Sequence, residues 1–200
     1  MEPANSEPFF RVIKIVRLHE AADSDLSFRV ATLADADCIS ALATQVYLNT
    51  YATEGIRPLL VREVNAQLSS AAISALISHP ATSFILVERA AHLIAFAQMT
   101  YGATHERIAA KNAVELDRLY VHERFTAQGI GKGLLSHVES LAASRGASAL
   151  WLTAWVHNLR ALRFYAAQGY VDVGMTMYRF EHEQHENRLF VKALRKAVAS

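Results

Sequence analysis

The segment Leu119–Leu135 (LYVHERFTAQGIGKGLL) constrains the fold of this chain more than any other part of the sequence. An apolar strand ends at Val121, a loop carries glycines at 129, 131 and 133, and an amphipathic helix is expected from Gly131 to Arg145. Glycine lets backbone N–H groups approach a ligand closely, and a helix N-terminus carries partial positive charge. The segment therefore predicts a site for a phosphate or pyrophosphate group.

Two common nucleotide-binding patterns do not fit this loop. A Walker loop needs a lysine followed by Ser or Thr, whereas Gly133 follows Lys132 here. The glycine spacing is G-x-G-x-G rather than the G-x-G-x-x-G of dinucleotide-binding folds. A phosphate-loop hydrolase is therefore disfavoured, and a tight strand-to-helix turn without a ligand remains the simpler alternative.

Hydrophobic periodicity predicts one mixed α/β domain with helices between strands in its second half. Residues 1–26 are expected to form an N-terminal extension, either disordered or with a short strand, and 27–200 the domain. The expected helices run from Asp35 or Asp37 to about Tyr51, from about Leu60 to Ser78, from Gly131 to Arg145 and from Asn158 to Gln168. The expected strands are Phe28–Leu33, Phe84–Glu88, Leu93–Tyr101, Val114–Val121, Ala149–Ala154, Tyr170–Phe180 and Arg188–Leu194.

Composition excludes several classes of protein. The chain has 200 residues, is 52% hydrophobic and carries a formal net charge of +1, which argues against disorder and against binding nucleic acid or an anionic membrane. The single cysteine, Cys38, excludes an internal disulfide and is expected to be a buried thiol on the apolar side of a helix. We expect a cytoplasmic location. No metal site is expected, because His182 and His185 lack a convincing third ligand and are assigned to a solvated loop.

A second motif follows the glycine loop. Asn158 and Tyr165 are seven residues apart (NLRALRFY), which is two helical turns, so they share one helix face. Taken alone, Asn158 is typical of a helix cap and Tyr165 of a core aromatic residue. Their position after a glycine loop makes a joint functional role more plausible.

The strand ELDRLYV, the loop QGIGKGLL and the segment NLRALRFYAAQGY resemble, in this order, the motifs of the GNAT superfamily of N-acetyltransferases. The resemblance covers about Phe28 to Leu194. Within the superfamily, ELDRLYV, the Tyr47–Tyr51 helix and the strand end WLTAWVHN look most like bacterial polyamine acetyltransferases of the PaiA type. The resemblance implies a mixed, mostly antiparallel central sheet flanked by helices, with acetyl-CoA as co-substrate.

The resemblance also implies where acetyl-CoA binds. Backbone groups of Leu119 and Val121 would pair with the pantetheine arm, amides around Gln128 to Lys132 would cradle the pyrophosphate, and Asn158 would orient the arm. The implied binding residues are Leu119, Tyr120, Val121, Thr126, Gln128, Gly129, Ile130, Gly131, Lys132, Asn158 and Tyr165. Lys111, Arg118 and Arg124 are further candidates for phosphate contacts, with ordinary surface charge as the default interpretation.

The chain departs from the family pattern at the start of the loop. Thr126 stands where the family usually has Arg or Gln, and Ala127 stands where glycine is common. A second register that begins at Gln128 is an alternative, although Val121 and the pair Leu134-Leu135 favour the first. This departure predicts weaker CoA binding, with the backbone cradle retained.

The chemistry of amide formation assigns the remaining roles. An amine of pKa about 10 must lose a proton before it attacks a thioester, so a general base is needed. Glu115 and Asp117 are the candidate bases, with ordinary solvation at a strand edge as the alternative. By resemblance, Tyr165 would protonate the CoA thiolate and the N–H near Leu119 would stabilise the oxyanion.

The acceptor is expected to be a small amine, with a polyamine favoured. Its pocket is assigned to 47–58, the second helix and the strand segment 175–178, where Glu54 and Glu63 join Glu115 and Asp117 as local negative charge. A protein N-terminal or lysine amine and a non-catalytic CoA-binding regulatory module remain as alternatives. A homodimer is left open.

Overall fold

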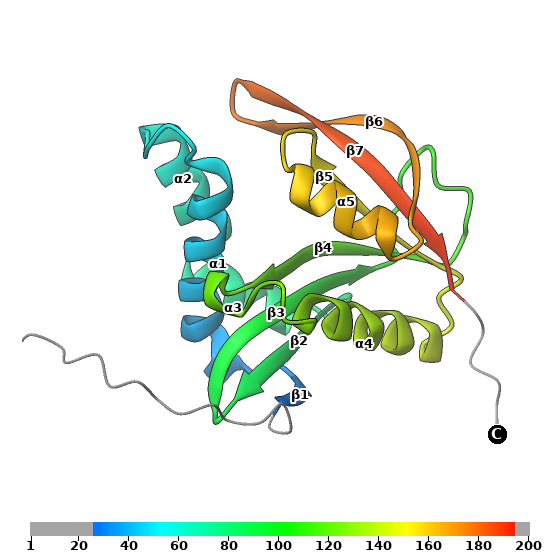
Figure 1. Cartoon of the computed structure of the whole chain (residues 1–200), viewed down its shortest axis with the longest axis horizontal. Coiled ribbons are helices and arrows are strands. Elements are labelled where there is room, and N and C mark those ends of the chain that lie inside the picture. The colour runs from blue at the N-terminus through cyan, green and yellow to red at the C-terminus, as the bar shows by residue number, and fades with distance from the viewer. Residues whose placement is uncertain (1–25, 195–200) are drawn as a thin grey trace, which may run out of the picture.

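The fold is built on one seven-stranded mixed sheet. It is described by a computed structural model that covers residues 26–194 (Figure 1). The strands are β1 (Leu26–Val30), β2 (Thr82–Arg89), β3 (His92–Tyr101), β4 (Ala113–Val121), β5 (Ala149–Trp155), β6 (Val171–Phe180) and β7 (Glu183–Ala193). The helices are α1 (Ala36–Tyr51), α2 (Pro58–Gln67), α3 (Ser70–Ser78), α4 (Ile130–Ser144) and α5 (Leu159–Ala167), with 3-10 turns η1 (Leu33–Asp35) and η2 (Glu123–Phe125).

The strands follow the spatial order β1-β2-β3-β4-β5-β7-β6. Every neighbouring pair is antiparallel except β4 and β5, which run parallel and are joined through α4. The expected mixed, mostly antiparallel sheet flanked by helices is therefore confirmed. The parallel pair matters for function, because it needs a crossover helix and so fixes the N-terminus of α4 at the end of β4.

Helices cover both faces of the sheet. Leu134, Leu135 and Val138 of α4 pack with α5 against β2 to β5 in the largest core cluster. On the opposite face, Ile39 of α1 and Ile73 of α3 pack against β2 and β3. Figure 1 shows α1 and α2 at one side of the molecule, with the turn of the β6–β7 hairpin extending toward them.

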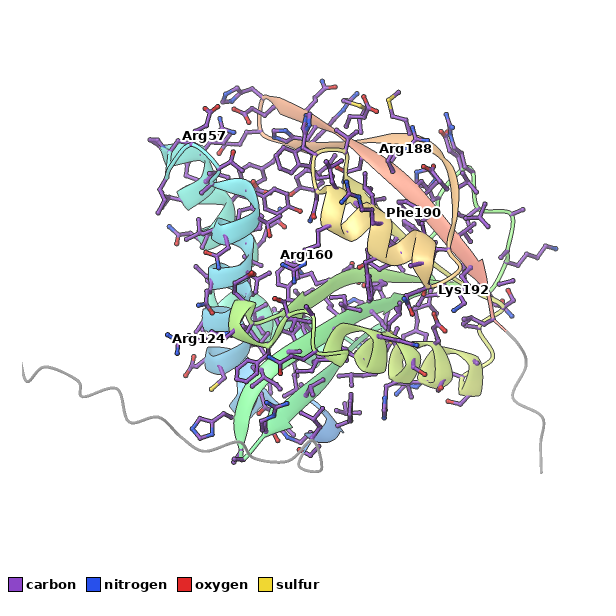
Figure 2. The ribbon with its side chains drawn as sticks, viewed as in Figure 1. Arg57, Arg124, Arg160, Arg188, Phe190 and Lys192 are labelled. Atoms are coloured by element: carbon purple, nitrogen blue, oxygen red, sulfur yellow. The ribbon has the colours of Figure 1, made fainter. Side chains whose placement is uncertain are left out.

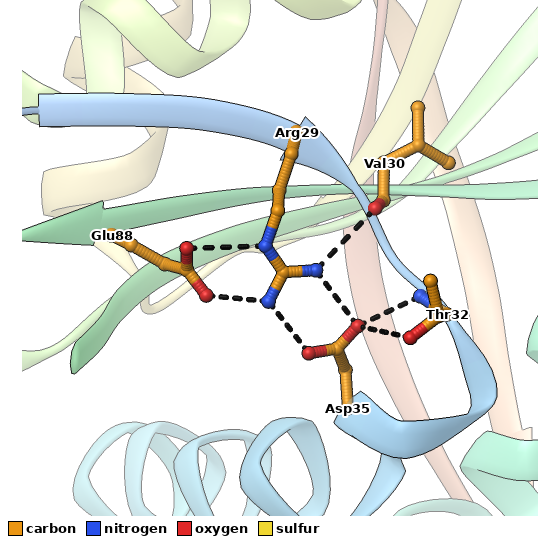
Figure 3. A network of polar contacts seen from close by, with 5 residues as sticks. All are labelled: Arg29, Val30, Thr32, Asp35 and Glu88. Atoms are coloured by element: carbon orange, nitrogen blue, oxygen red, sulfur yellow. Dashed lines mark hydrogen bonds and ion pairs between the residues drawn. The ribbon is translucent and has the colours of Figure 1, made fainter. Parts of the chain in front are cut away.

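A cluster of charged groups fixes α1 to the edge of the sheet (Figure 3). The Arg29 guanidinium on β1 donates to both oxygens of Asp35, at 2.8 and 2.7 Å, and to the Glu88 carboxylate on β2. Asp35 also accepts the backbone N–H of Thr32 at 2.7 Å. These bonds, those from Arg29 foremost, hold the pKa of Asp35 well below its usual range. The cluster therefore ties β1, β2 and the start of α1 together.

Three expectations are corrected by the structure. The helix expected over 60–78 is two helices, because Leu68 ends α2 and the Ser69 hydroxyl caps α3 by accepting the N–H of Ala72 at 3.3 Å. Cys38 is exposed on the first turn of α1 and is not part of the core. His185 lies on β7 rather than in a loop, while His182 is in the β6–β7 turn.

The expected extension falls almost wholly outside the described residues. Only Leu26 of residues 1–26 is described, and it is the first residue of β1, paired with Arg89. Within residues 26–194, no helix is long and apolar enough to cross a membrane.

Candidate active site

The site begins where β4 separates from β5. The two strands pair only from Ala113 to Glu115 on β4 and from Ala149 to Trp151 on β5. Beyond Glu115, β4 keeps its partner β3, with pairs up to Val121 opposite Ala95. One backbone edge of residues 116–121 is therefore open toward β5.

Strand alternation shows which backbone groups face this open edge. The N–H of His122 donates to the carbonyl of Ile94 at 2.9 Å, so it points toward β3. Alternate residues of an antiparallel strand point their N–H groups the same way, so that of Tyr120 also faces β3. The N–H groups of Leu119 and Val121 face the open edge, as the family resemblance requires.

A β-bulge in β4 redirects its side chains just before this edge. Gln98 of β3 pairs with Arg118 and Met99 pairs with Leu116, which leaves Asp117 as the extra residue. Glu115, before the bulge, therefore points to the same side of the sheet as Arg118 and Tyr120, after it. Leu119 joins Leu116 in packing on the α4 side.

The open edge forms one wall of a groove of about 1560 Å³, which we call the splay groove. It also runs along the N-termini of α4 and α5. Of the residues implied for acetyl-CoA binding, the groove is lined by Leu119, Tyr120, Val121, Thr126, Gly129, Gly131, Lys132, Asn158 and Tyr165. Two helix N-termini and Lys132 make this groove suitable for an anion such as a pyrophosphate.

Two of the implied residues do not line the groove. Gln128 is exposed and donates its side-chain amide to the carbonyl of Arg124 at 2.9 Å. The Ile130 side chain is 3% exposed and packs in the core beneath α4. Either residue could then contact a ligand through its backbone N–H rather than its side chain.

The start of the loop shows the consequence of the departure from the family pattern. Ala127 has φ +59° and Gly129 has φ +80°, both in the left-handed region where glycine is favoured. Thr126 uses its hydroxyl to donate to the carbonyl of Glu123 at 2.8 Å. The loop therefore keeps its glycine-like shape without a glycine at 127.

Gly131 lies against three side chains that line the groove. A Cβ built there would lie 3.7 Å from Val121 and Phe164 and 3.8 Å from Leu119. These are ordinary contacts, so a methyl group fits, whereas a branched side chain would fill space above the groove floor. The position matches a cradle in which backbone approaches a ligand.

Asn158 is a helix cap that also lines the groove. Its Oδ1 accepts the N–H of Ala161 at 3.1 Å at the start of α5. The cap engages the side-chain oxygen and leaves the Nδ2 amide as a donor that a ligand can meet. The capping role expected from the sequence is confirmed, and the ligand-binding role stays a prediction.

Tyr165 is 8% exposed, belongs to the core and lines the splay groove. Its ring packs edge-on against Phe164 and Tyr170, with centroids 5.2 and 5.7 Å apart. Burial, with a smaller contribution from Tyr120, raises the pKa of Tyr165 above its ordinary value. The hydroxyl is therefore protonated at neutral pH and able to donate a proton.

The positive charges near the groove differ from those expected. Arg160, at the start of α5, lines the groove and lies 3.5 Å from the Glu123 carboxylate of η2 (Figure 2). Lys111 and Arg124 are not among the lining residues. Arg118 is half-buried on the other side of β4, where it donates to the side-chain oxygen of Gln98, so it does not face the groove.

A second cavity adjoins the groove, which we call the tyrosine cavity. Its volume is about 560 Å³, within the range of roughly 300–1,000 Å³ typical of small-molecule sites. Its walls are rich in aromatic rings (Tyr47, Tyr51, Tyr120, Trp155, Tyr178) and carboxylates (Glu54, Glu63, Glu115, Asp117). Tyr51, Thr53, Tyr120 and Trp155 line both spaces, so the cavity and the groove meet there.

The two candidate bases lie in this cavity. Burial, with a smaller contribution from the charge of Asp117, raises the pKa of Glu115 to about 7. Burial also raises the pKa of Asp117. Two contributions act in the opposite direction: the Thr100 hydroxyl donates to Oδ2 of Asp117 at 2.8 Å, and Arg118 lies nearby with a positive charge. A carboxylate with a pKa near 7 is half-ionised at neutral pH and suited to accept a proton.

Most of the segments assigned to the acceptor pocket line the tyrosine cavity. Residues from 47–57, α2 and Tyr178 line the cavity, while Met175 is 45% exposed elsewhere on β6. The cavity is also lined by four residues that were not predicted for it, Thr153 and Trp155 of β5 and His185 and Asn187 of β7. The signal that could have found the last two is the alternation of β7, which places 185 and 187 on one face.

Comparison with known proteins agrees with this geometry. The family model described as the acetyltransferase (GNAT) family matches residues 45–170, which is more than half of the chain. An uncharacterized N-acetyltransferase of Mycobacterium tuberculosis (strain ATCC 25618 / H37Rv) is 25% identical over 162 residues, covering 81% of this chain and 99% of the relative.

Two solved structures share the fold. The PaiA N-acetyltransferase of Thermoplasma acidophilum in complex with coenzyme A is similar with a TM-score of 0.63 and 18% identity, covering 82% of this chain and 97% of that one. The putative acetyltransferase yncA of Salmonella typhimurium with acetyl-CoA has a TM-score of 0.60 and 17% identity, covering 88% and 98%. The chain therefore belongs to the GNAT acetyltransferase family and is an acetyl-CoA-dependent N-acetyltransferase.

Proposed function

We propose that this enzyme acetylates a primary amine of a small cationic molecule, with a polyamine as the favoured acceptor. The observation that carries the proposal is the position of Glu115 in an aromatic, carboxylate-lined cavity that opens into the splay groove. Carboxylates compensate the charge of an ammonium group, and aromatic rings attract it. The similarity to a solved PaiA N-acetyltransferase adds weak support for this class of acceptor.

The proposed reaction uses residues on both sides of β4. The amine nitrogen attacks the thioester carbon, and Glu115 takes the proton that the nitrogen loses. The N–H of Leu119 donates to the oxyanion, since it faces the open edge of β4. As the carbon–sulfur bond breaks, Tyr165 gives its hydroxyl proton to the thiolate of CoA.

A panel of amines assayed for free thiol release tests this proposal. Spermidine, a matched monoamine and a short peptide amine are compared at low and high salt, with Glu115→Gln as the variant. Glu106→Gln is the matched control, because it removes one carboxylate from a side chain that is 85% exposed. We expect spermidine to be acetylated best at low salt, and its advantage to shrink as salt screens the cavity charges.

Two other results of this assay would favour the alternative functions. A peptide amine as the best acceptor would transfer the assignment to protein N-terminal or lysine acetylation. Binding of acetyl-CoA without turnover of any amine would overturn the catalytic proposal in favour of a regulatory CoA-binding module.

A further inference from the structure

Glu63 is a buried carboxylate that faces the tyrosine cavity. It lies on α2, is 6% exposed and belongs to the cavity wall. The two arginines that flank it on the chain pair elsewhere, Arg57 with Glu183 and Arg62 with Glu181. Within residues 26–194, no Lys or Arg nitrogen lies within 4.0 Å of its carboxylate.

A chain of hydrogen bonds holds Glu63 in place. The Tyr178 hydroxyl donates to its Oε1 at 2.6 Å, and the Gln67 side-chain amide donates to the Tyr178 oxygen at 2.8 Å. The Arg118 guanidinium lies 3.4 Å from the Gln67 oxygen, which orients that amide. Because the Tyr178 oxygen already accepts from Gln67, its own proton points to Glu63, which therefore acts as an acceptor.

The tyrosines around Glu63 respond to its carboxylate. Burial and the interaction with Glu63 raise the pKa of Tyr178 to about 12, against an opposing contribution from Gln67. Burial, followed by the interaction with Glu63, raises the pKa of Tyr47 above its ordinary value. Both side chains therefore remain neutral hydroxyls beside the carboxylate.

Taking a carboxylate out of water without a cation costs free energy, and hydroxyl donors offset only part of that cost. A ligand that brings a cation into the cavity would supply the missing partner. Glu63 does not serve the reacting amine in the proposed mechanism, since Glu115 has that role on β4. Apart from the exposed Glu54, the cavity therefore offers acidic groups on two elements, Glu115 and Asp117 on β4 and Glu63 on α2.

We propose that Glu63, held by Tyr178 and beside Tyr47, binds the second, non-reacting ammonium group of the acceptor. This inference rests on the proposed acetylation of a small amine and adds the position of the distal cation. The acceptor is then an amine with two cations at a set spacing. Since Glu63 and Glu115 are fixed by α2 and β4, the rate should have an optimum in the number of carbons between the two nitrogens.

The inference has a consequence for the product. Acetylation turns one ammonium group into a neutral amide, so a mono-acetylated diamine has no second cation for Glu63. When its free amine sits at Glu115, the distal position holds only the amide. The enzyme should therefore transfer one acetyl group per diamine and release the mono-acetylated product.

The test compares straight-chain α,ω-diamines of increasing length with monoamines of equal length and with the mono-acetylated diamines. In the wild-type enzyme, we expect the best diamine to exceed its monoamine in kcat/KM by about 10- to 100-fold, the scale of hydrogen bonds to charged groups. Glu63→Gln should remove most of this advantage, because it lowers kcat/KM for the diamine far more than for the monoamine. Glu106→Gln, which removes an exposed carboxylate instead, should keep the advantage.

Tyr178→Phe supplies a second variant, because it removes the donor to Glu63 and keeps the ring. Its diamine advantage should fall, but less than in Glu63→Gln. Mass spectrometry at full conversion should show one acetyl group per diamine. A Glu63→Gln enzyme that keeps both the diamine advantage and the chain-length optimum would overturn the inference, as would rapid double acetylation by the wild type. Absence of transfer to every amine would instead overturn the proposed function.

Discussion

Glu115 and Leu119 are four residues apart on β4, yet Glu115 faces the tyrosine cavity and Leu119 lines the splay groove. Strict alternation would place both side chains on one side of the sheet. The bulge at Asp117 adds one residue and reverses the alternation between them. One strand thereby presents a candidate base on one side of the sheet and a groove wall on the other.

Replacement of Tyr165 by Phe tests the proposed proton donor. The ring is buried among Phe164, Tyr170 and Phe190, so the variant should keep its fold and its affinity for CoA. Turnover should fall, by roughly 10²-fold or more, because a positioned acid contributes on this scale. Pre-steady-state measurement under conditions where chemistry limits the rate checks this, and wild-type turnover would remove Tyr165 from the mechanism.

Substitutions at Gly131 test the placement of acetyl-CoA in the splay groove. A Cβ there meets its neighbours at 3.7 Å or more, so Gly131→Ala should fold and bind CoA with little loss. Gly131→Val adds two methyl groups above Val121 and Leu119 and should weaken CoA binding by at least about tenfold, or about 1.4 kcal/mol. Calorimetry measures both variants, and equal affinity in Gly131→Val and wild type would contradict this placement.

The Arg29 cluster should contribute to stability in a pH-dependent way. The pKa of Asp35 is lowered in the folded protein, so its contribution is full above the unfolded pKa of about 3.9 and is lost as pH falls below it. Asp35→Asn should lower the free energy of unfolding by about 1 kcal/mol at pH 7, since the Arg29 side chain is 38% exposed and screened. Denaturant unfolding at pH 7 and pH 3 should show this difference shrinking at the lower pH.

The buried carboxylate of Glu115 should lower the free energy of unfolding at alkaline pH. Its folded pKa of about 7 lies above the unfolded value of about 4.3, so folded stability is lost as pH rises through 7. Glu115→Gln removes this penalty and should raise the free energy of unfolding at pH 8 by on the order of 1 kcal/mol, after allowance for solvent screening. Thermal unfolding should show this gain at pH 8 and none at pH 4, and a destabilised variant at pH 8 would argue against a penalised charge.

Local patterns predicted the parts of the site that depend on neighbouring residues. The glycine loop, the capping role of Asn158 and the strand of Glu115 could be read from spacing, because each is determined by φ, alternation or a cap within a few residues. Gly146 is another such residue. It follows the last apolar residues of the α4 pattern, which is typical of a glycine that ends a helix, and its φ of +84° is in the left-handed region.

Other features depend on contacts between distant segments. The bulge at Asp117 arises from pairing with β3, and the contribution of His185 and Asn187 depends on β7 lying beside β5. The break between α2 and α3 was missed because Leu68 and Ser69 continue a helical periodicity, although Ser69 is a common capping residue. Cys38 was misplaced because it lies on the solvent-facing side of the first turn of α1, whereas Ala36 and Ile39 of the same turn face the core.

The most direct test of the account is the pH dependence of kcat/KM for the best small amine in wild type, Glu115→Gln and Asp117→Asn. The ratio of wild type to Glu115→Gln cancels the titration of the amine itself. We predict that this ratio rises with pH up to about 7 and then levels off, because Glu115 must lose its proton to act as the base. Asp117→Asn should keep the inflection but move it to lower pH, since the charge of Asp117 raises the pKa of Glu115. A ratio that stays flat from pH 5.5 to 9 would contradict the assignment of Glu115 and with it the central claim.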